Sequence, residues 1–198
     1  MSRVIAIMSM SLDGFVADAG DGVGEVFDWY FSSGDVEFDT GGSGPMTFKV
    51  SGPSARHLRE LVSGLGAMLT GRRTFDRADG WGGNHAWGPA FVLTHHIPEG
   101  WPRPNSTVHF VTDGIESAVR QAKAAAGGKN VGVHGADTIQ QLLNAGLLDE
   151  ISVDVAAVLL GSGVRLFDHL AGTPAVLGNP TVIAGVGVTH LRYPVRKA

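Results

Sequence analysis

Short apolar runs alternate with segments of helical periodicity along most of the chain, which is the pattern of an α/β protein. The apolar runs are typical of strands that are buried on both faces of a sheet. We expect such strands at residues 3–10, 67–70, 90–94, 107–112, 130–134 and 150–160, and shorter ones near 175–177, 181–184 and 188–193. Between them, apolar residues at helical spacing predict helices that start near Pro53, Asp113 and Gly135.

The order of these elements predicts a three-layer αβα fold. Strands and helices alternate in the first two-thirds, whereas strands dominate the last third, so we expect a mainly parallel sheet with an antiparallel C-terminal edge. The length fits one domain, residues 1–198. Residues 17–52 have no clear period and predict a long irregular insertion with one short element around 25–31. Asp113 and Glu116 predict a capping box.

Composition excludes several classes of protein. The absence of cysteine rules out a disulfide scaffold, a thiolate metal site and a cysteine nucleophile. The net charge of −4, with no long run of one sign, argues against nucleic acid as a partner. No histidine spacing suits a metal, so no metal is expected. No segment resembles a signal peptide or a membrane span, so we expect a cytoplasmic protein that does not bind membranes.

Three polar motifs follow predicted strands. Gly135-Ala136-Asp137-Thr138 begins a helix, where a glycine and free amides suit a diphosphate; the alternative is an ordinary strand-to-helix turn. Arg72 and Arg73 open another helix and suit a phosphate, or are simply solvated. Thr94 and His95 end a third strand and either contact a nucleotide or form a polar loop. Ligands of open α/β sheets bind at the carboxyl ends of strands, where all three motifs lie.

These segments resemble the dihydrofolate reductase superfamily, especially reductase domains related to the C-terminal half of the riboflavin biosynthesis protein RibD. The resemblance is carried by S-x-D-G-F at 11–15, T-G-R-R-T-F at 70–75, V-L-T-H at 92–95, and the stretches 134–150 and 158–167. It implies a dihydrofolate-reductase-like fold, NADPH as the cofactor, and hydride transfer to a substrate in the adjoining cleft. It also implies a homodimer through the C-terminal strands.

The resemblance implies a role for each matching residue. Arg72, Arg73 and Thr74 would face the 2′-phosphate and the diphosphate, and Thr94 and His95 would lie beside the 2′-phosphate and adenine. The diphosphate would lie on the helix start formed by Gly135, Ala136, Asp137, Thr138 and Ile139. The nicotinamide would be bordered by Met8, Ser9 and Val16.

The chain departs from the family on the substrate side. No acid is present near Ala55, where the folate enzyme has its helix carboxylate, and His134-Gly135-Ala136 replaces the glutamate and two glycines usual in RibD-type reductases. The D-x-P-x-L segment after Thr74 is also missing. We therefore expect an NADPH-dependent reductase of an unidentified, pterin- or pyrimidine-like small molecule. Alternatives are a riboflavin-pathway 5-amino-6-(5-phosphoribosylamino)uracil reductase and a non-catalytic nucleotide- or ligand-binding protein.

Five residues are candidates for the substrate side. Trp29 and Tyr30 either stack on a flat substrate or anchor the insertion to the core. His134 is the best candidate for proton transfer, because imidazole titrates near neutrality, but a structural role is open to it as well. His57 is a weaker candidate, and Asp13 is either a substrate ligand or a turn residue.

Overall fold

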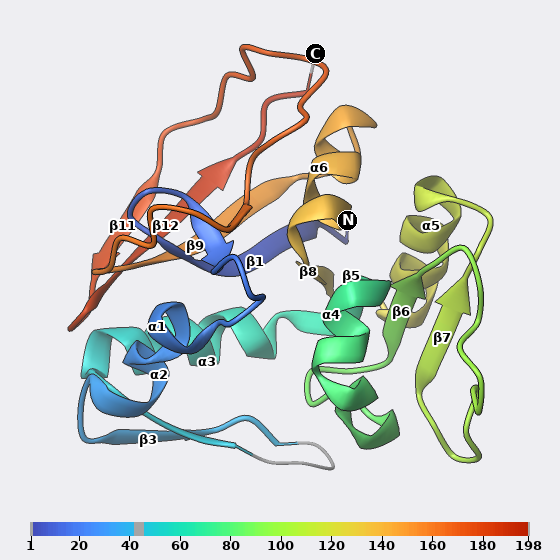
Figure 1. The fold of residues 1–198 in the computed structure, drawn as a ribbon, viewed down its shortest axis with the longest axis horizontal. Coiled ribbons are helices and arrows are strands. Elements are labelled where there is room, and N and C mark those ends of the chain that lie inside the picture. Colours follow the sequence, from blue (N-terminus) through green and yellow to red (C-terminus); the bar gives the residue numbers. More distant parts are fainter. Residues whose placement is uncertain (1, 42–45, 198) are drawn as a thin grey trace.

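An eight-stranded sheet runs through the described part of the computed structural model, residues 2–41 and 46–197 (Figure 1). In spatial order its strands are β11 (Thr181–Ala184), β12 (Val188–Pro194), β9 (Glu150–Ala156), β1 (Val4–Ser11), β8 (Asn130–His134), β5 (Leu65–Gly71), β6 (Ala90–Leu93) and β7 (Val108–Val111). The strands from β9 to β7 pair in parallel, whereas β12 and β11 form an antiparallel edge. The predicted fold class is therefore confirmed.

Helices cover both faces of this sheet because successive side chains of a strand point to opposite faces. The helices are α1 (Gly24–Phe27), α2 (Trp29–Ser32), α3 (Gly52–Ser63), α4 (Arg72–Arg77), α5 (Ile115–Ala125) and α6 (Ala136–Asn144). In β1, Val4 and Ala6 pack in the core that contains α5 and α6. Ile5 and Ile7 pack in the opposite core with Leu61 of α3 and Phe75 of α4, which gives three layers.

The insertion at 17–52 is more regular than its sequence suggested. Besides α1 and α2 it contains a hairpin of β3 (Val36–Asp39) and β4 (Thr47–Val50), and residues 42–45 lie outside the described part. Trp29, Tyr30 and Phe48 pack with Leu58 of α3 in a third apolar cluster. Elements of four residues are too short to show a period, so the sequence could not reveal them.

Three local expectations are wrong. Helix α5 is capped by Gly114 at φ 102°, without a side-chain cap, so Asp113 and Glu116 do not form the predicted capping box. Strand β9 ends at Ala156 rather than near residue 160. Residues 175–177 contribute only an isolated bridge between Leu177 and Val195.

Two further short elements complete the fold. Strand β2 (Phe15–Ala17) pairs with β10 (Val164–Arg165), and a turn of 3-10 type, η1 (Asp79–Gly83), follows α4. Within the two described ranges, no helix combines the length and apolar character that crossing a membrane requires.

Candidate functional site

A cavity of about 1380 Å³ opens at the carboxyl ends of β1, β5, β6 and β8. Its other walls come from α1, α2, the β3–β4 hairpin and the loop that joins η1 to β6. Pockets for a small molecule usually measure about 300–1,000 Å³, so this cavity has room for more than one small ligand. Its position matches the edge at which open α/β sheets bind ligands.

The turns after β5 and β8 nearly touch inside this cavity. Gly135, the residue before α6, has a φ of 95°, and a Cβ on it would lie 2.8 Å from Thr74 Oγ1. A Cβ on Gly71, the residue before α4, would lie 2.9 Å from Thr138 Oγ1. Glycine at both positions therefore lets the two turns approach each other closely, because a side chain there would collide with a threonine of the other turn.

The start of α6 offers unpaired polar groups to this part of the cavity. Ala136, Asp137 and Thr138 occupy the first turn, whose amides have no acceptor within a helix. The Thr138 hydroxyl is buried and has no hydrogen-bond partner. Ile139 differs, because it is fully buried outside the cavity and its amide donates to the Gly135 carbonyl. Gly135, Ala136, Asp137 and Thr138 therefore line the cavity, whereas Ile139 does not.

The arginines of α4 line the same cavity with their charges already partly paired. Arg72 Nε donates to the Asp76 carboxylate at 2.8 and 2.9 Å, and its Nη1 donates to the His96 carbonyl at 3.3 Å. Arg73 forms a two-pronged ion pair with Asp21, whose pKa is lowered mainly by that hydrogen bond. Arg72 thus lies nearest the end of β6.

The end of β6 forms the third side of this polar region. Thr94 and His95 both line the cavity, and the Thr94 hydroxyl donates to the His96 carbonyl at 2.9 Å. Strands β8, β5 and β6 are neighbours in the sheet, so the three motifs that the sequence indicated separately lie side by side. Met8, Ser9 and Val16 line the cavity as well.

Trp29 and Tyr30 stack on each other with ring centroids 3.8 Å apart. Trp29 is buried outside the cavity and donates from Nε1 to Ser9 Oγ at 3.2 Å. Tyr30 lines the cavity, and its hydroxyl donates to Asp154 Oδ2 at 3.4 Å. Trp29 therefore acts as the anchor of the insertion, whereas Tyr30 presents part of its ring to the cavity.

Behind Tyr30 lies a fully buried polar cluster that the sequence did not reveal. Asp154 Oδ1 accepts a hydrogen bond from His190 Nδ1 at 2.7 Å and lies 3.5 Å from His57 Nε2. His190 Nε2 in turn lies 2.8 Å from Ser54 Oγ. Burial alone would raise the pKa of the Asp154 carboxyl, but the hydrogen bond from His190 and the close approach of His57 hold it below its ordinary value. Asp154 is therefore an ionised residue at the centre of the cluster, and only 2% of its surface is exposed.

This cluster bears on two residues of α3 that the sequence analysis discussed, Ala55 and His57. Ala55 is fully buried in apolar surroundings, and the nearby carboxylate comes from β9 as Asp154 instead. His57, Asp154 and His190 have ligand atoms within 4.8 Å of one another, but the two imidazole rings stack at 4.4 Å and His190 binds Asp154 directly. We interpret the cluster as a hydrogen-bonded core network. Its members are too far apart in sequence to form a motif.

Asp13 lies away from the cavity and closes a turn. Its carboxylate accepts hydrogen bonds from the Ser11 hydroxyl and from the amides of Leu160 and Gly161. The Ser11 hydrogen bond is the main cause that lowers the Asp13 pKa to about 2. This arrangement fits the turn role and not contact with a substrate.

His134 lies at the end of β8, where it meets two residues that the sequence did not single out. Its ring centroid lies 5.8 Å from that of His85 and 5.6 Å from that of Trp87, and all three residues line the cavity. Burial lowers the pKa of His134 to about 4, and burial with the neighbouring His134 lowers that of His85 to about 3. Both rings are therefore uncharged at neutral pH, so His134 carries no imidazolium proton to donate.

These shifts predict a loss of stability in mild acid. Histidine in an unfolded chain has a pKa of about 6.5. Below that pH the unfolded chain therefore binds protons at these two residues, whereas the folded chain does not. Each histidine should lower the free energy of unfolding by about 2 kcal/mol at about pH 5 relative to pH 7. Urea unfolding at both values should show this loss, and replacing both residues (His85→Gln with His134→Gln) should remove most of it. His169→Gln, an exposed control, should leave it unchanged; equal pH dependence in all three proteins would contradict the assignment.

The fold and the cavity are those of an α/β protein with an open cavity at the carboxyl edge of a mainly parallel sheet. The chain belongs to the RibD C-terminal domain family, whose pattern it matches over residues 2–192. This is a family of reductases with the dihydrofolate reductase fold. No curated protein matches the chain.

Solved structures share this fold over nearly the whole chain. A protein from Shewanella sp. PV-4 assigned to riboflavin biosynthesis is 23% identical, with 98% of this chain and 99% of that chain covered and a TM-score of 0.67. A pyrimidine reductase-like protein from Corynebacterium diphtheriae is 14% identical, with coverages of 100% and 93% and a TM-score of 0.59. Dihydrofolate reductase from Enterococcus faecalis, complexed with NADP(H), is 11% identical, with coverages of 98% and 97% and a TM-score of 0.58. At these identities the likeness concerns the fold alone.

Proposed function

We propose that this protein is an NADPH-dependent reductase that transfers hydride to a small organic substrate. The observation that carries the proposal is the adjacency of three turns, after β6, β5 and β8, which present guanidinium groups, hydroxyls and helix-start amides to one cavity. Membership of a reductase family supports reduction as the chemistry.

The residues present fit such a dinucleotide at both ends of this polar region. Gly135 leaves space where a side chain would fill the gap to Thr74, and the buried Thr138 hydroxyl lacks a partner. A diphosphate there would accept hydrogen bonds from the α6 amides and gain from the helix dipole. Arg72, with Thr94 and His95 beside it, suits the 2′-phosphate, because guanidinium offers paired donors to phosphate oxygens.

The remaining cavity residues would position the substrate and exclude water. NADPH, when bound, supplies the hydride, so the protein has to hold the two reactants in the correct orientation. Met8 and Ser9 at the end of β1 lie between the polar region and Tyr30, where the two reactants would meet. The walls formed by α1, α2 and the hairpin would shield that point from solvent.

A non-catalytic nucleotide-binding protein is the second candidate, because Ala55 removes the acid that the folate enzyme uses. Steady oxidation of NADPH in the presence of candidate acceptors would separate the two functions. Binding without turnover across a broad set of flat heterocycles and quinones would favour the second candidate.

Arg72→Ala should weaken NADPH binding about 10- to 100-fold and leave NADH binding nearly unchanged. A hydrogen bond to a charged group contributes about 1.5–3 kcal/mol, and NADH lacks the phosphate that Arg72 would bind. Dissociation constants for both dinucleotides can be measured by fluorescence titration. Arg120→Ala on α5, outside the cavity, serves as the control. An equal loss for both dinucleotides, or no loss, would refute a 2′-phosphate role for Arg72.

The homodimer through the C-terminal strands stays a prediction. Strand β11 is the edge of the sheet, and Val182 on it is 58% exposed. An exposed apolar side chain on an edge strand is compatible with pairing to a second copy.

A further inference from the structure

The cavity has a second region, beside the turns after β5 and β8, whose walls are aromatic. We call it the aromatic chamber and define it by the cavity-lining residues Phe27, Tyr30, Phe48, Trp81, His85, Trp87 and His134. On one wall, His85 lies 4.8 Å from Trp81 and 5.6 Å from Trp87, centroid to centroid. On the other, Tyr30 lies 5.3 Å from Phe27 and 4.4 Å from Phe48. Flat faces and ring edges of this kind suit a planar aromatic molecule.

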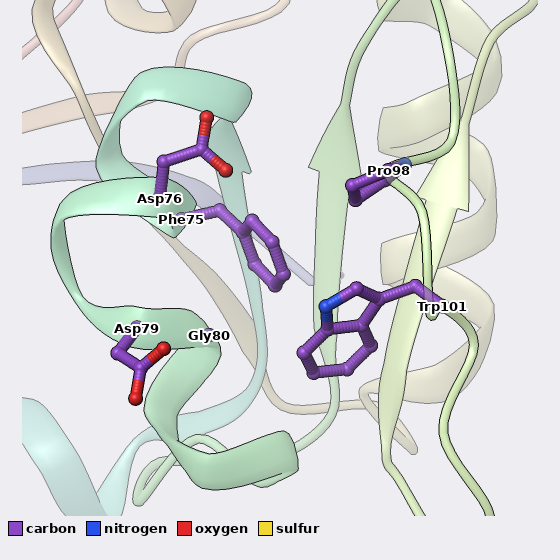
Figure 2. A pocket seen from close by; sticks show the side chains of 6 residues that line it. All are labelled: Phe75, Asp76, Asp79, Gly80, Pro98 and Trp101. Atoms are coloured by element: carbon purple, nitrogen blue, oxygen red, sulfur yellow. The ribbon is translucent and has the colours of Figure 1, made fainter.

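Trp81 is held in this wall by a strained turn. Its φ is 51°, in the left-handed region that tryptophan rarely adopts, and the neighbouring Gly80 has a φ of 56°. Figure 2 shows Phe75 and Trp101 facing each other beside Gly80, on the side of η1 where a separate small cavity of about 130 Å³ lies. A Cβ on Gly80 would lie 2.7 Å from the Trp101 ring and 2.8 Å from the Phe75 ring. Backbone strain of about 1–3 kcal/mol is typical of ligand sites.

The residues that define the chamber carry no charge at neutral pH. Buried imidazoles with lowered pKa values, about 3 for His85 and about 4 for His134, are neutral at physiological pH. Trp87 Nε1 is buried without an acceptor, which costs free energy until a bound molecule or a local rearrangement supplies one.

The cationic side chains of the cavity are not among the residues that define the chamber. Among the lining residues that the structure describes, the arginines are Arg72, Arg73 and Arg77, all on α4. Arg77 is bound to Asp21 at 3.2 Å and to the Gly20 carbonyl at 3.1 Å, and Arg73 shares the same Asp21. A phosphate carried by the substrate would therefore find no free guanidinium in the chamber, and burying it there would be costly.

From this charge distribution we infer that the substrate is a planar, uncharged aromatic or heteroaromatic compound without a phosphate group, held between the two walls of the aromatic chamber. This inference rests on the proposed function, because only a reductase would use the molecule in the chamber as a hydride acceptor. It disfavours a ribosyl-phosphate substrate, and hence the riboflavin-pathway alternative.

A matched pair of probes tests this inference: 1-naphthol, which is planar and uncharged, and 1-naphthyl phosphate, which adds only the phosphate. Calorimetric titration of the full chain, with and without saturating NADPH, should show 1-naphthol binding at least about tenfold more tightly. Trp87→Leu should weaken 1-naphthol binding about tenfold, because a stacking surface is lost. Phe167→Leu, outside the cavity, should leave it unchanged.

The outcomes separate this inference from the proposed function. Equal or tighter binding of 1-naphthyl phosphate, failure of both probes to bind, or full retention of 1-naphthol binding in Trp87→Leu would overturn the inference while NADPH binding stands. Absence of NADPH binding in the same titrations would overturn the proposed function, whatever the naphthol result.

Discussion

Gly135→Ala is expected to weaken NADPH binding about 100-fold. The new Cβ would lie 2.8 Å from Thr74 Oγ1, so we expect the turn after β8 to move away from the turn after β5. That movement would displace the first amides of α6 from the diphosphate, and losing even one or two hydrogen bonds to a charged group costs about 3 kcal/mol. Titration of the purified variant with NADPH, followed by tryptophan quenching, measures the effect.

Gly146→Ala provides the control at the other end of the same helix. Gly146 also has a positive φ, 66°, but a Cβ there would meet no atom within 4 Å. Both variants should lose about 1–2 kcal/mol of stability from the strained backbone, because L-residues disfavour this region. Only Gly135→Ala should lose NADPH affinity. Similar affinities for the two variants would show that no anion is bound at the start of α6.

Asp154→Ala is expected to cause the largest loss of stability in the chain, about 3–5 kcal/mol. Removing one partner of a buried ionic network leaves the others without their acceptor, and here His190, His57 and Tyr30 all face the lost carboxylate. At about 2–4 °C per kcal/mol for a chain of this size, the melting temperature should fall by about 6–20 °C. Thermal unfolding at neutral pH measures the change.

The pH dependence of this loss gives an internal check. The folded-state pKa of Asp154 is lowered, so its stabilising contribution is present above about 3.9, the unfolded value, and fades as the pH falls through the folded value. The difference between the wild type and Asp154→Ala should therefore narrow in strong acid. Asp168→Ala, an exposed control, should change the melting temperature little at any pH. A loss below about 1 kcal/mol for Asp154→Ala would mean that the network is not ionic.

The strands of the sheet and the turns after β5 and β8 could be predicted from sequence because their signals are local. Buried strands such as β5 and β8 are uninterrupted apolar runs, and Gly135 marks the turn by the backbone freedom it provides. The order β8-β5-β6 in the sheet brings those turns together, and the sequence did not predict that order. The resemblance to a known family indicated the same residues as candidates for the site.

The substrate side could not be predicted in the same way because it is assembled from distant segments. Asp154, His190 and Ser54 come from two strands and a helix and meet only after folding. The stretch from Trp81 to Trp87 offered a signal, two tryptophans and a histidine among glycines, but nothing in it shows which face meets a cavity. Its packing against His134 depends on the neighbouring end of β8.

The central claim is that a 2′-phosphorylated dinucleotide lies across the ends of β6, β5 and β8. Calorimetric titration of the unmodified protein with NADPH and, separately, with NADH tests it most directly. We expect saturable binding of one NADPH per chain, with a dissociation constant at least about tenfold lower than that for NADH. No binding of NADPH at millimolar concentration, or equal affinity for the two dinucleotides, would contradict it.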